Sequence, residues 1–180
     1  MDDKSNDYLP SVLGYSSENT VMLDLDNFSF KEIKKLAMRF MKNQNCKGYS
    51  IQKLDGLLIL KSSKRHYHAV FDRHVDWAEN TKYIGYACLW THRIELLKWV
   101  VMQLVKGCST IRVSNKGAKK PPRIVYRSGS QNNRIKHFLD ERKLLLEIYR
   151  DMQKKANGKL TLTGEVEREE DYPLKVVNLS

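Results

Sequence analysis

The segment Val21-Met-Leu-Asp-Leu-Asp26 is an apolar run in which acidic residues occupy two alternate positions. Such alternation predicts a half-buried β-strand. Side chains two residues apart on a strand share one face, so Asp24 and Asp26 would lie side by side, opposite Leu23 and Leu25. Adjacent carboxylates repel each other, and a bound Mg²⁺ or Mn²⁺ would remove that cost because these ions prefer oxygen ligands. Alternatively, Asp26 caps the next turn or helix and Asp24 is exposed.

The rest of the chain supplies strands and helices in a mixed order. Ser29 and Glu32 form a capping box that predicts a helix directly after the first strand. The helix at 91–106 has Ile94, Leu97, Val101 and Leu104 at helical spacing, which predicts that this side packs on the core. The further predicted elements are strands 49–52, 56–61 and 66–71, a helix at 76–89, two basic strands at 109–114 and 123–127 joined as a hairpin, and a helix at 131–155.

Antiparallel strands mixed with helices indicate an α+β fold. We expect an antiparallel sheet of the RNA-recognition-motif or ferredoxin-like type, with helices packed on one face. At 180 residues the chain is predicted to be one domain at 19–156, with a flexible N-terminal arm at 1–18 and an acidic tail or added strand at 157–180.

The charge indicates a polyanionic partner. Lys and Arg number 32 against 21 Asp and Glu, which gives a net charge of +11. No acid occurs between Leu96 and Leu139, whereas a surface that is basic only for solubility would mix both signs. We therefore predict a groove for the phosphate backbone of a nucleic acid. Its expected contacts are Lys116, Lys119, Lys120, Arg123 and Arg127.

A second polar cluster follows strand 56–61. Its hydroxyls, cations and imidazoles gather within seven residues, at the turn and start of the next strand, a combination suited to binding a triphosphate. His66 and His68 share one strand face, so they could also chelate one metal ion, while Tyr67 points to the core. The predicted nucleotide-binding residues are Ser62, Ser63, Lys64, Arg65, His66, His68 and Arg112.

The two clusters together resemble the archaeo-eukaryotic primase-polymerase superfamily. That family carries Asp-x-Asp on its first motif strand, as in Asp24-Leu-Asp26, and then Ser before His on a later strand, as in Ser62 to His68. Ser109-Thr-Ile-Arg112 is similar to an arginine-bearing strand of plasmid and viral members. The resemblance spans roughly residues 20–130. It implies catalytic roles for Asp24, Asp26 and His68.

The resemblance further implies a minimal plasmid- or virus-type DNA primase-polymerase: a nucleotidyltransferase that uses Mg²⁺ or Mn²⁺. Its expected partners are nucleoside triphosphates, a single-stranded template or primer-template DNA, and other replication proteins. The family also supplies a third metal carboxylate from a later strand, which the segment 109–127 lacks. Asp76 is the predicted substitute, and Asp72 is the other nearby acid.

Two other functions fit part of the pattern. A rolling-circle replication initiator would use His66-Tyr67-His68 for its metal and a tyrosine nucleophile, for which Tyr149 and Tyr126 are candidates. A DNA-binding protein that kept the fold and lost catalysis would need neither. The sequence favours a cytoplasmic protein, because no apolar stretch approaches the ~20 residues of a membrane span and three scattered cysteines form no disulfide framework.

Overall fold

The computed structural model describes residues 12–42, 44–46, 49–117 and 119–159. Its main sheet has four strands in the order β2-β6-β5-β8, and every neighbouring pair is antiparallel. These strands are β2 (Thr20–Asp26), β5 (Gly56–Ser63), β6 (His66–His74) and β8 (Arg123–Gly129). The predicted α+β class with an antiparallel sheet is confirmed.

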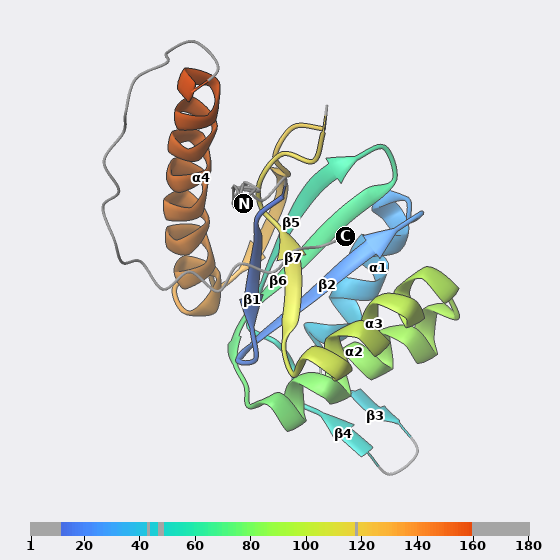
Figure 1. The fold of residues 1–180 in the computed structure, drawn as a ribbon. Coiled ribbons are helices and arrows are strands. Elements are labelled where there is room, and N and C mark those ends of the chain that lie inside the picture. The colour runs from blue at the N-terminus through green and yellow to red at the C-terminus, as the bar shows by residue number, and fades with distance from the viewer. Residues whose placement is uncertain (1–11, 43, 47–48, 118, 160–180) are drawn as a thin grey trace.

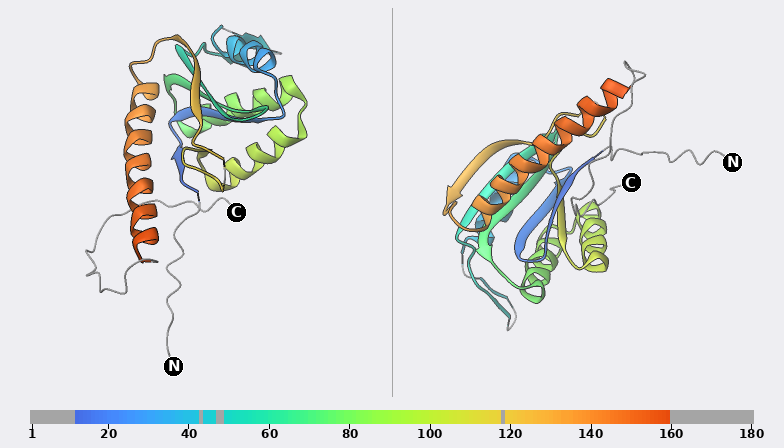
Figure 2. Two further views of the ribbon diagram at one scale, coloured as in Figure 1. Left: turned by 90° about the horizontal axis from the view of Figure 1, so that it is seen from above. Right: turned by 60° about the vertical axis from the view of Figure 1, so that its left-hand side comes forward.

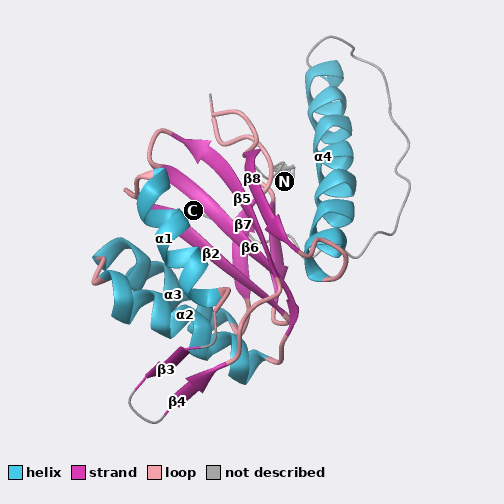
Figure 3. Cartoon of the chain, turned by 180° about the vertical axis from the view of Figure 1, so that it is seen from behind, coloured by secondary structure: helices cyan, strands magenta, loops and turns pink. Residues whose placement is uncertain are grey.

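Helices α1 (Phe30–Phe40) and α2 (Trp77–Thr91) cover one face of the sheet, and α3 (Ile94–Lys106) lies beside α2 (Figures 1 and 3). Alternate strand residues fill the core under them: Leu23 and Leu25 from β2, Leu57 and Ile59 from β5, and Ala69 and Phe71 from β6. The predicted capping box starts α1, since the Ser29 hydroxyl accepts from the Glu32 N–H while Glu32 accepts from the Ser29 N–H. Gly107 ends α3 in the left-handed region, at φ 71°.

The opposite face carries a second apolar cluster, built on Met22, Leu58, Leu60 and Val70. A two-stranded ribbon, β1 (Gly14–Ser17) with β7 (Ser109–Arg112), covers part of it, and α4 (Arg134–Lys159) packs Ile135 and Phe138 onto the rest (Figure 2). The expectation of helices on one face therefore holds for α1 to α3, and α4 adds a helix on the other face. The small hairpin β3 (Gln44–Cys46) and β4 (Tyr49–Ile51) stands apart from the sheet.

Three sequence-based predictions differ from the structure. The basic strands β7 and β8 do not form a hairpin, because β7 pairs with β1 while β8 pairs with β5. Residues 12–17, predicted to belong to a loose arm, are folded because β1 pairs with β7 and buries Leu13 and Tyr15; the first 11 residues and the predicted tail from 160 lie outside the described residues. On α3 the buried side chains are Leu96, Val100 and Gln103, so the predicted apolar face is exposed instead.

Among the described residues, no helix is both long enough and apolar enough to cross a membrane.

Candidate nucleotide and metal site

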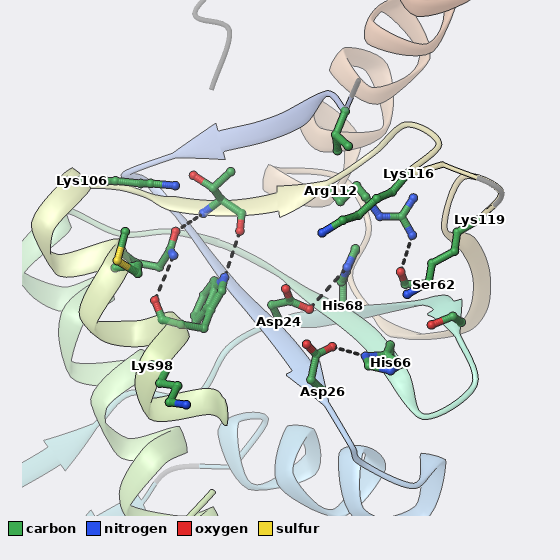
Figure 4. Close-up of a pocket in the computed structure, with 16 residues that line it drawn as sticks. Asp24, Asp26, Ser62, His66, His68, Lys98, Lys106, Arg112, Lys116 and Lys119 are labelled. Carbon is green, nitrogen blue, oxygen red and sulfur yellow. Dashed lines mark hydrogen bonds and ion pairs between the residues drawn. The ribbon is translucent and has the colours of Figure 1, made fainter. Parts of the chain in front are cut away.

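Register between β2 and β6 places the acidic and histidine pairs opposite each other. Asp24 faces His68 and Asp26 faces His66 across the two strands. His66 Nδ1 lies 2.5 Å from Asp26 Oδ1, and His68 Nε2 lies 3.5 Å from Asp24 Oδ1. All four side chains point to the face opposite α1 (Figure 4). Tyr67 packs in the core, as predicted. The alternative of an Asp26 that only caps a helix is not observed, since Ser29 caps α1.

These residues line a cavity of about 450 Å³, a volume typical of small-molecule sites. The β5–β6 hairpin contributes Ser62 and Ser63, and β7 contributes Thr110 and Arg112. The loop after β7 adds Lys116 and Lys119, and one side of α3 closes the cavity with Lys98, Trp99, Met102, Gln103 and Lys106. The lining thus contains five cationic side chains and two carboxylates, so the cavity favours the binding of an anion.

Arg112 is held in place from three sides and is only 8% exposed. Its guanidinium donates to the Ser62 hydroxyl and to the backbone carbonyls of Ser114 and Lys120. Burial lowers the pKa of Arg112, and the nearby Asp24 carboxylate opposes this effect. Because an arginine stays protonated in proteins, Arg112 is a fixed positive charge beside the acidic pair.

Burial changes the protonation of the two groups on the floor of the cavity. Desolvation and the charge of Asp26 raise the pKa of Asp24 to about 7. Desolvation and the charge of Arg112 lower the pKa of His68 to about 3, so its ring is neutral at pH 7. His68 is 3% exposed, and its Nδ1 is a buried polar atom without a hydrogen-bond partner in the described residues. An unsatisfied atom of this kind costs ~1–3 kcal/mol unless a ligand or water completes it.

Several predicted residues lie away from the cavity. Lys64 and Arg65 form the exposed turn between β5 and β6, where Arg65 donates to the Asn27 carbonyl at 2.7 Å. Lys120 contributes its carbonyl, to Arg112, and its side chain does not line the cavity. Arg123 and Arg127 lie on β8, two strands away from β6.

Neither substitute for the third carboxylate joins the acidic pair. Asp76 is the N-cap of α2, where its side chain accepts from the Glu79 N–H at 2.6 Å. Asp72 faces the start of α4 and accepts from Asn132, Asn133 and Ile135 N–H groups at 2.9–3.0 Å. The structure thus places Asp76, predicted as a metal ligand, at a helix terminus and outside the cavity that contains Asp24 and Asp26. Within the described residues, no group of three or more His, Cys, Asp or Glu side chains could hold a metal.

The α3 contribution was missed by sequence reasoning. Lys98 and Lys106 belong to the acid-free segment that predicted the basic groove, so a signal for them existed. Gln103 holds α3 against β7: it accepts from the Thr110 N–H at 2.9 Å, while the Trp99 indole donates to the Thr110 carbonyl at 3.2 Å. No local pattern encodes this packing of a helix against a strand.

A sequence model of the archaeo-eukaryotic primase 1D-like family matches residues 16–125. The chain belongs to this archaeo-eukaryotic primase family. The match covers β2 through β7, which include the strands and the helix that line the cavity, and supports a primase-like role in replication. Comparisons with curated proteins and with solved structures find no match.

Proposed function

We propose that the cavity binds a nucleoside triphosphate with a divalent cation and transfers its nucleotide to a DNA-templated strand. The observation that carries this proposal is the register that sets Asp24 and Asp26 beside His68 beneath five cations. A triphosphate needs several positive groups around it and oxygen ligands for its metal. The DNA strand would lie along Lys116 and Lys119 at the cavity rim.

The residues present fit one divalent ion held together with a triphosphate. Asp24 and Asp26 supply carboxylate oxygens on one strand face, and Mg²⁺ commonly binds through one or two carboxylates plus substrate phosphates. When bound, such an ion neutralises phosphate charge during phosphoryl transfer. Since only these two carboxylates line the cavity, the protein does not complete a second ion site from the described residues.

Each remaining side chain has a distinct proposed role. Arg112 and Lys98 would bind phosphate oxygens, Arg112 as a fixed guanidinium and Lys98 as a mobile ammonium. The unpartnered Nδ1 of neutral His68 would form a hydrogen bond with the bound nucleotide or with a water molecule. Asp24 would hold a proton near neutral pH in the empty cavity and release it when a cation binds, because a nearby positive charge stabilises the carboxylate.

Neither tyrosine that was predicted as the nucleophile of an initiator is suitably placed for that role. Tyr149, on α4, is buried in the second apolar cluster, and Tyr126 packs beside the core on the opposite face of the sheet. Neither tyrosine lines the cavity that contains His66 and His68. The non-catalytic alternative remains the main competitor, because the cavity has two carboxylates rather than three.

The test is extension of a primed DNA template with Mg²⁺ or Mn²⁺ by the full chain and by an Asp24→Asn, Asp26→Asn double variant. We expect extension by the wild type and a loss of at least ~100-fold in the double variant. Affinity for DNA should stay within about twofold or tighten, since two negative charges are removed. Asp76→Asn is the matched control and should extend normally.

Three results would overturn the proposal. Full extension by the double variant would separate the activity from the acidic pair. A wild type that binds DNA but extends nothing with either ion would establish a non-catalytic binder. A covalent protein–DNA adduct that disappears in Tyr149→Phe or Tyr126→Phe would favour the initiator instead.

A further inference from the structure

An aromatic and cationic patch lies on the sheet face that α1 covers, opposite the cavity. Phe30, at the start of α1, is 37% exposed and is the one aromatic residue among the large hydrophobic side chains exposed in the described part of the chain. Its ring packs edge-on against Tyr126 of β8, with centroids 6.1 Å apart, and lies 6.2 Å from the ring of Tyr67 on β6. The three rings therefore form one aromatic surface, and Phe30 is its open side.

Three cations lie beside these rings. Lys34 Nζ is 4.7 Å from the centroid of the Tyr126 ring, and Lys61 Nζ is 5.9 Å from that of Tyr67. Arg123 is exposed and is the partner of Lys61 across β5 and β8, so both side chains leave the same face of the sheet. We call this set the α1–β8 patch: Phe30, Lys34, Lys61, Tyr67, Arg123 and Tyr126.

The segments that build the α1–β8 patch are almost free of acids. Residues 56–71 and 123–129 contain none, and α1 contains one, Glu32. Glu32 accepts from the Ser29 N–H and pairs with Arg93 at 2.9 Å, so its charge is used elsewhere. Among the described residues, the three cations of the patch form no ion pair. A surface that is basic only for solubility mixes both signs, so this patch favours a polyanion.

The α1–β8 patch and the cavity lie back to back on the β5–β6 hairpin. Lys61 directly precedes Ser62, which lines the cavity, and Tyr67 lies between two histidines that line it as well (Figure 4 labels Ser62 and the histidines). The exposed turn between the two strands adds the cations Lys64 and Arg65. A DNA strand that leaves the cavity rim can therefore cross this turn and stay next to positive charge until it reaches the patch.

We propose that the α1–β8 patch binds the single-stranded part of a DNA template, with a base stacked on Phe30 and phosphates bound by the three cations. Sites for single strands combine aromatic rings, on which bases stack, with cations that follow the backbone. The bases of a duplex are already stacked on one another, so only a single strand can use the rings. The patch also gives a role to Arg123, which the sequence predicted as a DNA contact and which lies away from the cavity. Binding at the patch needs no catalysis, whereas delivery of the strand to the cavity rests on the proposed function.

The first test compares the affinity of the full chain for a single-stranded oligonucleotide and for a blunt duplex of the same length. Phe30→Leu keeps an apolar side chain without a ring, so it should weaken single-strand binding by at least about fivefold and change duplex binding by less than about twofold. Phe30→Tyr keeps the ring and should bind like the wild type. Leu144→Ala, on α4, is the matched control for an exposed apolar side chain, since Leu144 is 51% exposed, and it should change neither affinity. Equal losses on both ligands, or no loss, in Phe30→Leu would overturn the proposal.

The second test needs no variant, so it holds even if Phe30→Leu folds poorly. A single-stranded oligonucleotide that carries 5-iodouracil is irradiated with the wild-type full chain, and the adducts are mapped by mass spectrometry. We expect an adduct on Phe30 or Tyr126, because this base couples to aromatic rings on which it stacks. Adducts confined to residues outside the patch would refute it.

The third test measures the cations through salt. Lys34→Gln with Arg123→Gln should reduce the slope of log affinity for a single strand against log salt by about 1.4. Lys154→Gln with Lys155→Gln, which removes two charges from α4, should leave the slope unchanged. An equal slope in the wild type and the patch variant would show that the patch contacts no phosphates.

Primer extension separates this inference from the proposed function. If the wild type extends no primer while Phe30→Leu still weakens single-strand binding, the patch stands and the nucleotidyl transfer is refuted. If the wild type extends primers while Phe30→Leu binds a single strand as tightly as the wild type, the transfer stands and the patch is refuted.

Discussion

Replacing Asp24 with Asn should stabilise the protein at pH 8 and have little effect at pH 4. The pKa of Asp24 is raised from 3.8 to about 7, mainly by burial and then by Asp26. The folded state therefore binds a proton that the unfolded state has released, so the free energy of unfolding falls as pH rises from about 4 to about 7. Above pH 7 the folded protein carries the full cost of the buried charge.

The size of this change in the free energy of unfolding follows from the shift in the pKa of Asp24. Three pKa units correspond to about 4 kcal/mol, at ~1.4 kcal/mol per unit. Because 30% of the Asp24 side chain is exposed, solvent screening reduces this to about 2 kcal/mol. For a chain of this length, 2 kcal/mol raises Tm by roughly 4–8 °C. Arg112 should keep its hydrogen bonds to Ser62, Ser114 and Lys120 in the variant, because none of them involves Asp24.

The assay is thermal or urea unfolding of the full chain at pH 4 and pH 8, with a chelator present. Asp76→Asn is the matched control, because it removes the same charge at an N-cap where Asn is as favourable as Asp; its stability should change by less than about 0.5 kcal/mol. Destabilisation by Asp24→Asn at both pH values, or a gain independent of pH, would refute the account of a strained, buried carboxylate.

Four further predictions concern single contacts. Gly56→Ala should lower the free energy of unfolding by at least about 3 kcal/mol, because the added Cβ would lie 1.7 Å from the Ser130 carbonyl oxygen. The control is Gly85→Ala on α2, whose Cβ would meet nothing within 4 Å and which should stabilise the protein by ~0.5–1 kcal/mol in urea unfolding. Asp72→Ala should lower the free energy of unfolding by roughly 3 kcal/mol at pH 7. Burial raises the pKa of Asp72, but hydrogen bonds from Ser130 and three N–H groups lower it below 3.8 overall, so this stabilisation should fade below pH 4 in acid unfolding. Ser62→Ala removes a hydrogen-bond partner of the buried Arg112, so it should lower the free energy of unfolding by ~1–2 kcal/mol and raise KM for nucleotide. If both values are unchanged, Ser62 does not support the site as described. Lys116→Ala with Lys119→Ala should reduce the slope of log affinity for single-stranded DNA against log salt by about 1.4, while Lys154→Ala with Lys155→Ala on α4 should leave it unchanged.

The acidic and histidine pairs were predictable because strands have a simple period. Alternation fixed the shared face of Asp24 and Asp26 and of His66 and His68, and antiparallel pairing of β2 with β6 brought the two pairs together. Tyr67 was assigned to the core by the same rule, and it packs there. Local periodicity thus sufficed for the part of the site that lies on adjacent strands.

The α3 side of the site depends on contacts that local patterns do not contain. Seven of the nine residues from Ile94 to Met102 are apolar, so helical periodicity could not decide which side of α3 faces the core. Gln103, a polar residue, is buried because it accepts from a backbone N–H of β7. The hairpin predicted for 109–127 failed for a related reason: β7 finds its partner in β1, almost 100 residues earlier in the chain.

The most direct test of the central claim is the position of a divalent ion in the full-length protein. Crystals grown with Mn²⁺ and a non-hydrolysable nucleoside triphosphate should show one anomalous peak within ~2.0–2.3 Å of oxygens from both Asp24 and Asp26, with the phosphates next to Arg112 and Lys98. A peak bound only by His66 and His68, or a triphosphate bound elsewhere with no ion at the acidic pair, would contradict the account.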